Sequence, residues 1–93
     1  MGMTAVVGQE QTVKGVFTDG DLRRAIGKGL DLRKTPINDI MSANPRTIGP
    51  DRLAAEAVEI MERNKVTQLL VVDDGGHLVG ALNIHDLFRN KVV

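Results

Sequence analysis

One segment occurs twice in the sequence, and this repeat limits the folds that the chain can adopt. At an offset of 65 residues, VVGQEQTVKGVFTDGDLRR (residues 6–24) aligns without a gap on VVDDGGHLVGALNIHDLFR (residues 71–89). In each copy, two stretches that are apolar at alternate positions flank a turn, and a helical pattern starts near Asp19 or Ile84. The repeat therefore predicts two β-hairpins, each followed by a short helix.

The residues between the copies predict a short helix and a short strand. Thr35 is a residue type that caps helices, and the proline after it suits a first helical position, so a turn of helix is expected in INDIM (residues 37–41). Asn44-Pro45 stops this helix, and a brief strand is expected at residues 46–48.

A longer amphipathic helix is expected from a cap at Asp51 to about Arg63. Its predicted buried stripe comprises Leu53, Ala57, Ile60 and Met61. The glutamates on the other side are spaced as in a solvated face, so they do not indicate a catalytic carboxylate pair.

These elements predict an α+β fold made of two repeated β-α-β-β-α units, of which the first is incomplete. Residues 35–93 hold a complete second unit, and residues 1–34 hold only the strands, helix and linker of a first unit. About thirty residues that open the second unit have no counterpart before Met1. The first strand should therefore lie at an open edge of its sheet. We expect a homodimer in which the second copy covers this edge.

Size and charge exclude several classes of protein. A chain of 93 residues can bury a single core. Twelve basic and twelve acidic residues give no net charge, and only two residues are aromatic. Basic residues do cluster between Arg23 and Lys34, but without excess charge or aromatic residues among them the chain does not resemble a nucleic-acid-binding protein. No apolar run reaches membrane-span length, so no membrane partner is expected. The absence of cysteine excludes disulfides and thiolate metal sites and is compatible with a cytoplasmic location.

The first copy offers a candidate binding site at the end of its second strand. Thr18 ends the strand and Asp21 lies in the first turn of the following helix, where a hydroxyl, a carboxylate and free N–H groups suit a phosphorylated ribose. An alternative explanation needs no ligand: Thr18 or Asp19 caps the helix, and Asp21 interacts favourably with its dipole.

The second copy keeps the aspartate as Asp86 but has Asn83 in place of the hydroxyl. His85 lies in the first helical turn and could contact phosphate, and Thr47 in the returning strand could contact a base or a phosphate. Thr47 could equally be a strand residue chosen for its β-propensity. Neither histidine has metal-ligand spacing, and no nucleophile has a partner base, so neither a metal site nor catalysis is expected.

The two glycine-to-aspartate turns and the repeat resemble a tandem pair of CBS domains, the Bateman module. The pattern INDIM...P.TI......A...M....V..LLVVDDGGHLVGALNIHDL resembles a complete CBS domain. More narrowly, GVFTDGDLRRAIGKGLDLRKTPINDIM and LVGALNIHDLFRNKVV are similar to the C-terminal region of arabinose-5-phosphate isomerases, where a sugar-isomerase domain precedes the CBS pair. In that family the isomerase makes a precursor of Kdo, a lipopolysaccharide sugar.

The resemblance implies a regulatory region without catalytic residues of its own. It implies two clefts for a regulatory ligand, ATP, ADP, AMP or a nucleotide sugar such as CMP-Kdo. Carried over from the family, Thr18 and Asp21 would serve one cleft, and Thr47, Asn83 and Asp86 the other. It also implies a homodimer formed through the CBS helices, within a higher oligomer of the parent enzyme. The remaining alternative is a module that binds no ligand and only assembles that oligomer.

Overall fold

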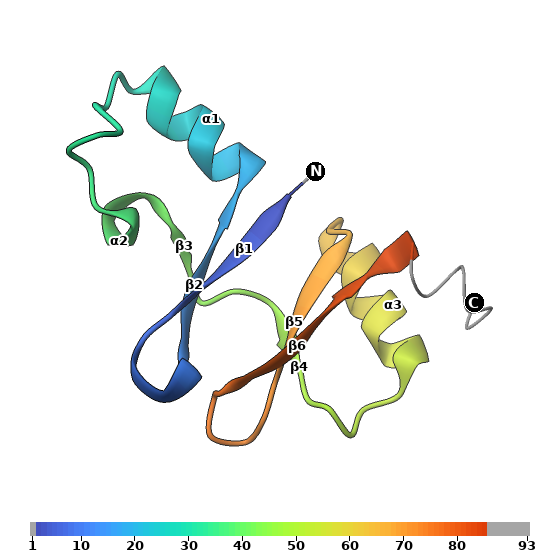
Figure 1. The fold of residues 1–93 in the computed structure, drawn as a ribbon. Helices are drawn as coiled ribbons and strands as arrows, with labels where there is room; N and C mark the ends of the chain where they lie inside the picture. Colours follow the sequence, from blue (N-terminus) through green and yellow to red (C-terminus); the bar gives the residue numbers. More distant parts are fainter. Residues whose placement is uncertain (1, 86–93) are drawn as a thin grey trace.

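Two antiparallel hairpins form the framework of residues 2–85, the part of the chain that the computed structural model describes (Figure 1). The first hairpin pairs β1 (Met3–Val7) with β2 (Val13–Thr18). The second pairs β5 (Gln68–Val72) with β6 (Leu78–Asn83). Both hairpins predicted from the repeat are therefore confirmed.

The hairpins repeat in register as well as in sequence. Val6 pairs with Gly15 in the first hairpin, and the equivalent Val71 pairs with Gly80 in the second. In each hairpin the register shifts directly after this valine, so even the bulge is repeated. The same sequence pattern thus produces the same local backbone twice.

The chain between the hairpins supplies one strand to each sheet. β3 (Ser42–Ala43) pairs antiparallel with β2, giving the order β1-β2-β3, and β4 (Thr47–Ile48) pairs parallel with β5, giving the order β4-β5-β6. The strand expected at residues 46–48 is confirmed, whereas β3 was not expected. We call residues 42–46 the connecting segment; it comprises β3 and the three residues that lead from β3 to β4. The unit boundary at residue 35 stays a prediction, although β3, which follows it, joins the first sheet.

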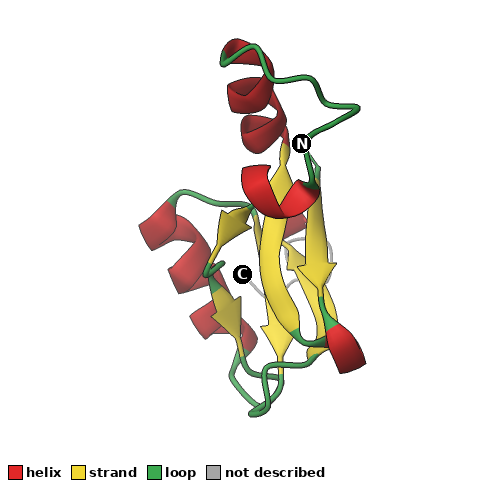
Figure 2. Cartoon of the chain, turned by 90° about the vertical axis from the view of Figure 1, so that its left-hand side faces the viewer, coloured by secondary structure: helices red, strands yellow, loops and turns green. Residues whose placement is uncertain are grey.

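α1 (Asp19–Gly27) begins where the repeat predicts a helix and is packed on one narrow face only. Its buried residues are Asp21 and Ala25. Leu22 is 37% exposed and Ile26 is 58% exposed. α1 extends beyond the ends of the strands, whereas the helix of the second unit lies alongside them (Figure 2).

α2 (Ile37–Ile40) is the short helix predicted in INDIM, but it is not capped as expected. Its N-cap is Pro36, which makes no side-chain capping bond. The Thr35 hydroxyl instead donates to the carbonyl of Asp31, at 2.8 Å. The predicted Thr35 cap is therefore wrong, because the helix begins one residue later and the Thr35 side chain bonds back to the preceding turn.

α3 (Ala54–Asn64) starts three residues after the predicted cap at Asp51. Ala57 and Met61 are fully buried as expected, but Leu53 is 68% exposed. Leu53 has an extended backbone before the first helical residue, so its side chain does not follow the helical stripe. The prediction that it belongs to the buried face is wrong.

The main core lies between α3 and the second sheet. Its buried members are Ile48, Ala57, Val58, Met61 and Leu69. Partly buried apolar residues pack around them: Ala54, Ile60, Val71, Leu82 and Ile84. Within residues 2–85, no second helix of this kind covers the first sheet (Figure 1). None of the described helices is long and apolar enough to cross a membrane.

The two halves meet at the turns of their hairpins as well as through the connecting segment. The Val13 N–H donates to the carbonyl of Gly76 at 3.0 Å, and Thr12 forms a bridge with His77. The halves are therefore joined at two separate places, which fixes the space between them.

Gly15 is required where the chain of Met41 and Ser42 lies against β2. A Cβ at this position would lie 2.6 Å from the carbonyl oxygen of Ser42 and 2.9 Å from the sulfur of Met41. We expect Gly15→Ala to destabilise the protein by about 1–3 kcal/mol, because backbone must move to relieve the overlap. Thermal unfolding measures this as a lower midpoint.

The repeat provides the control for this prediction. At Gly80, the equivalent glycine, a Cβ would meet nothing within 4 Å. Gly80→Ala should therefore lower the free energy of unfolding by no more than about 0.5 kcal/mol. If the two variants lose equal amounts of stability, the close contact of Ser42 and Met41 with β2 at Gly15 is contradicted.

Candidate functional site

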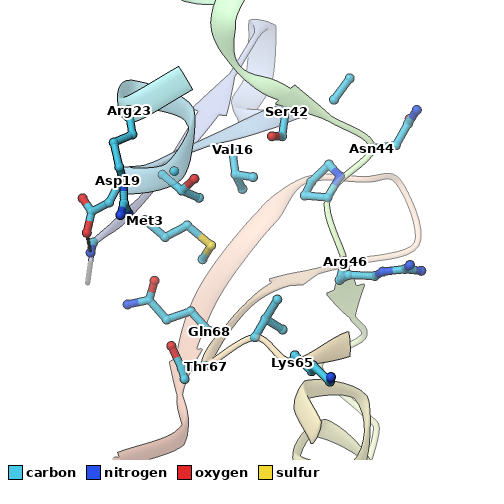
Figure 3. A pocket seen from close by; sticks show the side chains of 16 residues that line it. Met3, Val16, Asp19, Arg23, Ser42, Asn44, Arg46, Lys65, Thr67 and Gln68 are labelled. Atoms are coloured by element: carbon cyan, nitrogen blue, oxygen red, sulfur yellow. Dashed lines mark hydrogen bonds between the residues drawn. The ribbon is translucent and has the colours of Figure 1, made fainter. Parts of the chain in front are cut away.

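A cavity of about 440 Å³ lies where the two halves meet (Figure 3). Residues from both halves line the cavity. They are Val16, Arg23 and four stretches of chain, residues 2–3, 18–20, 42–46 and 65–68. The starts of β1 and β5 are equivalent in the repeat, and both border the cavity. Equivalent positions of the two repeat copies therefore face the same cavity.

The walls of the cavity are apolar and its edges are basic. Apolar side chains of Met3, Val16, Pro45 and Val66 lie among the lining residues. Lining cations lie on both sides in Figure 3, namely Arg23, Arg46 and Lys65. Among the described residues, Asp19 is the one carboxylate in the lining, and one of its oxygens accepts from the Gly2 N–H at 2.9 Å. The composition favours a ligand with an apolar ring and a negative charge.

Thr18 and Asp21 cap α1 reciprocally. The Asp21 N–H donates to the Thr18 hydroxyl oxygen at 3.2 Å, and the Thr18 N–H donates to the Asp21 carboxylate at 2.8 Å. This arrangement satisfies two backbone donors that a helix start otherwise leaves free. The predicted cap at Thr18 is therefore confirmed, whereas the reciprocal bond from Asp21, for which only an interaction with the helix dipole is expected, is an addition.

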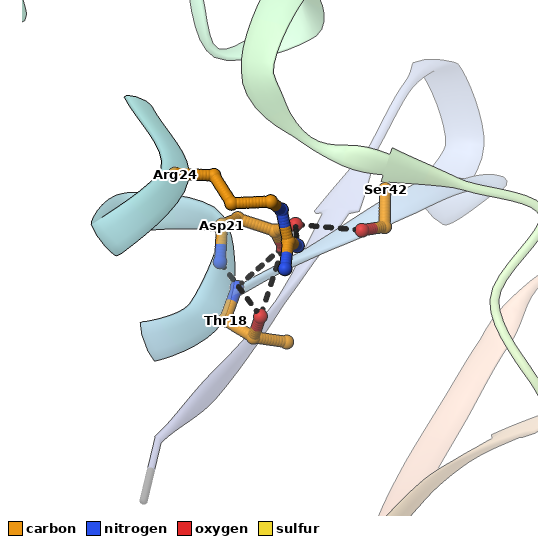
Figure 4. Close-up of polar contacts among 4 residues, drawn as sticks. All are labelled: Thr18, Asp21, Arg24 and Ser42. Carbon is orange, nitrogen blue, oxygen red and sulfur yellow. Dashed lines mark hydrogen bonds and ion pairs between the residues drawn. The ribbon is translucent and has the colours of Figure 1, made fainter. Parts of the chain in front are cut away.

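Asp21 is also the centre of a buried polar cluster (Figure 4). Its side chain is only 3% exposed. Oδ1 accepts from the Ser42 hydroxyl at 2.7 Å and from the Arg24 guanidinium, and Oδ2 accepts from the Thr18 hydroxyl at 3.0 Å. Burial raises the pKa of Asp21, but the hydrogen bonds from Ser42, Thr18 and Arg24 outweigh it and lower the pKa below 3.8. The carboxylate is thus ionised and fully satisfied.

These bonds limit what the predicted site residues can offer a ligand. Thr18 lines the cavity, but its hydroxyl donates its proton to Asp21, so it offers no free donor to a phosphate. Asp21 itself borders a second space of about 230 Å³ between α1 and α2. A ligand hydroxyl could reach the carboxylate only by replacing an existing bond.

The predicted residues of the second copy lie elsewhere. Asn83 accepts the His85 N–H through its side-chain oxygen at 2.8 Å, and His85 is exposed. Thr47 is partly buried in β4. None of these three lines the 440 Å³ cavity, and Asp86 lies outside the described residues. The structure therefore brings Thr18 to the cavity, but not Thr47, Asn83 or His85.

Sequence reasoning missed three stretches of the cavity wall, residues 2–3, 42–46 and 65–68. All three lie in short strands, at strand starts or in irregular chain, so hydrophobic periodicity does not mark them. The repeat did contain a signal: Thr67 and Gln68 are the equivalents of Gly2 and Met3, and symmetry brings the equivalent positions to one place.

Two small α+β halves thus meet at a cavity of the size that small-molecule sites have. The family model of the CBS domain matches residues 37–92. The chain belongs to the CBS domain family.

Relatives and solved structures agree with this assignment. The chain is 47% identical over its whole length to the arabinose 5-phosphate isomerase KdsD of Pseudomonas aeruginosa and 41% identical to that of Escherichia coli K12. It spans 28% of the length of these relatives. It matches their C-terminal region, so the resemblance found from the motifs is confirmed.

Solved CBS proteins share the fold. A CBS domain protein from Pyrobaculum aerophilum in complex with AMP is 30% identical and superimposes with a TM-score of 0.80, over 92% of this chain and 66% of that one. CBSX2 in complex with AMP is 25% identical, with a TM-score of 0.79 over 97% of this chain and 70% of that one. The predicted α+β CBS fold is thereby confirmed.

Proposed function

We propose that this chain is the ligand-sensing CBS region of an arabinose-5-phosphate isomerase, and that it binds a nucleotide in the cavity between its halves. The parent enzyme is inferred from the KdsD relatives, whose remaining length this chain does not cover. The nucleotide is inferred from the AMP complexes of similar CBS proteins. The expected cytoplasmic location remains a prediction.

The cavity is the observation that carries the proposal. Its volume of about 440 Å³ lies within the roughly 300–1,000 Å³ of small-molecule sites. Val16, Pro45 and Val66 provide apolar surface for a base, and Arg23, Arg46 and Lys65 provide positive charge for a phosphate. An adenosine nucleotide or a nucleotide sugar such as CMP-Kdo has both features.

Ligand binding would regulate the isomerase by favouring one arrangement of the module. A ligand shifts such an equilibrium only as far as its affinities for the two arrangements differ. The proposal therefore requires that the cavity change shape or order when the isomerase domain changes activity.

Val66→Glu tests the cavity directly. Val66 is 36% exposed and lines the cavity, so glutamate can be accommodated while its charge opposes a phosphate. We expect the Kd for AMP, measured by isothermal titration calorimetry, to rise at least about tenfold. ADP, ATP, CMP and CMP-Kdo are measured in the same way to identify the preferred ligand.

Val79→Glu is the matched control. Val79 is 57% exposed on β6 and does not line the cavity. Its Kd for AMP should stay within about twofold of the unsubstituted chain. If both variants bind AMP equally well, the ligand does not occupy this cavity; if none of the nucleotides binds the unsubstituted chain, the sensing proposal fails.

Assembly without a ligand is the second candidate function, and the exposed apolar face of α1 favours it. Leu22 and Ile26 lie on this face, 37% and 58% exposed. A homodimer through the helices would bury them. Ile26→Glu should then convert dimer to monomer in sedimentation velocity, without loss of helix content. A monomeric unsubstituted chain, or an unchanged dimer in the variant, would contradict assembly through α1.

A further inference from the structure

The connecting segment, residues 42–46, forms one continuous wall of the cavity. All five of its residues line the cavity, from Ser42 at the end nearest α1 to Arg46 at the entrance of β4. A molecule that fills the cavity therefore contacts this segment. Such contacts would stabilise the closed position of the segment.

The segment is held to the first sheet by few interactions. Its sheet pairing is limited to Gly15 with Ala43 and Val16 with Ser42. Asn44, directly after β3, has a positive φ of 55°. A left-handed backbone is one that asparagine adopts readily, so it ends the pairing without strain. Segments with so little pairing typically open locally at a lower free energy than the core.

A single side-chain bond joins this segment to α1. The Ser42 hydroxyl donates to Asp21 at 2.7 Å across 21 residues of sequence. Among the described residues of α1, Asp21 and Ala25 are the buried ones, so this bond is one of the few buried contacts of the helix. When the connecting segment opens, Asp21 loses Ser42, and a buried carboxylate is left with an unsatisfied acceptor position.

We infer that the Ser42–Asp21 bond couples occupation of the cavity to the order of α1. A ligand that stabilises the closed connecting segment also keeps Ser42 on Asp21 and thereby stabilises α1, whose apolar residues Leu22 and Ile26 face solvent. Ser42 is a positioning residue in this scheme, since it acts through Asp21. The inference rests on the proposed nucleotide site and specifies how that site reports its occupation.

Amide hydrogen exchange of the 93-residue chain, with and without saturating AMP, tests the coupling. At 100 times the Kd, exchange through openings that destroy the site can slow by up to about 100-fold. We expect amides from Arg23 to Gly27 to slow at least about tenfold together with those of residues 42–46. Because Ser42 lines the cavity, Ser42→Ala is measured at 100 times its own Kd for AMP. At that saturation AMP should protect residues 42–46 in the variant as well, but the effect on α1 should fall below about twofold.

Thr35→Val is the control, because it removes a hydroxyl bond near α1 that does not involve the cavity. It should keep the full response of α1 to AMP. If AMP binds by calorimetry but α1 does not respond, or responds equally in Ser42→Ala, the coupling is wrong and the nucleotide site stands. If AMP and the other nucleotides do not bind at all, the proposed function is wrong and the coupling is overturned with it.

Discussion

Leu69→Ala is expected to lower the free energy of unfolding by about 2–5 kcal/mol, the usual cost of removing a large buried side chain. Leu69 lies in β5 with 0% exposure, beside the equally buried Met61 of α3. The main core is small and lies on one side of the molecule. Few other contacts can compensate for a cavity there, so the loss should be a large share of the total stability.

Urea unfolding followed by circular dichroism measures this loss. Leu53→Ala is the control: it removes the same number of atoms, but Leu53 is 68% exposed. Its effect should stay within about 0.5 kcal/mol. Similar losses in the two variants would contradict the placement of the core between α3 and the second sheet.

Asp21→Ala is expected to destabilise the protein by about 2–4 kcal/mol, because it removes one half of the α1 capping box and leaves the Ser42 hydroxyl without its acceptor. Arg24 contributes little to this value, since its side chain is 64% exposed. Asp19→Ala removes an exposed carboxylate from the same helical turn and should cost less than about 1 kcal/mol. Equal costs measured by urea unfolding would contradict the buried cluster.

The pH dependence gives an independent test of the same cluster. Because the pKa of Asp21 is lowered in the folded protein, the stability it contributes is present above the ordinary value of 3.8 and is lost as the pH falls through the folded pKa. The advantage of the unsubstituted chain over Asp21→Asn should be constant between about pH 5 and 7 and should shrink below about pH 4. A constant advantage down to pH 2 would mean that Asp21 is not the titrating group.

This cluster also changes how ligand binding should be tested. The motif suggests Asp21 as the residue to remove, but its loss affects folding before it affects any ligand. Substitution of cavity residues that make no such bonds, such as Val66, separates binding from stability.

The repeat predicts most of the regular structure because hairpins and helix starts are local. Alternation and turn residues define both hairpins, and Thr18 marks the start of α1. β3 escaped prediction because it consists of two residues and exists only through its pairing with β2. Leu53 was misplaced because the helical pattern does not show where the helix begins.

The candidate site was only partly predictable, because part of it depends on contacts between residues far apart in the sequence. Thr18 and Asp21 stand out as residue types in a motif, yet Asp21 is also bonded to Ser42, which is 21 residues away in the sequence. The cavity wall formed by residues 42–46 and 65–68 results from the contact of the two halves. No local pattern in the sequence encodes that contact.

Mapping of AMP on the chain by NMR chemical-shift perturbation tests the central claim most directly. Binding in the cavity between the halves should shift the amide signals of Thr18, of the connecting segment and of residues 65–68. The strand positions around Val79 should remain unchanged. Shifts centred on Asn83 and His85, with none in the connecting segment, would contradict the account, as would a spectrum that AMP leaves unaltered.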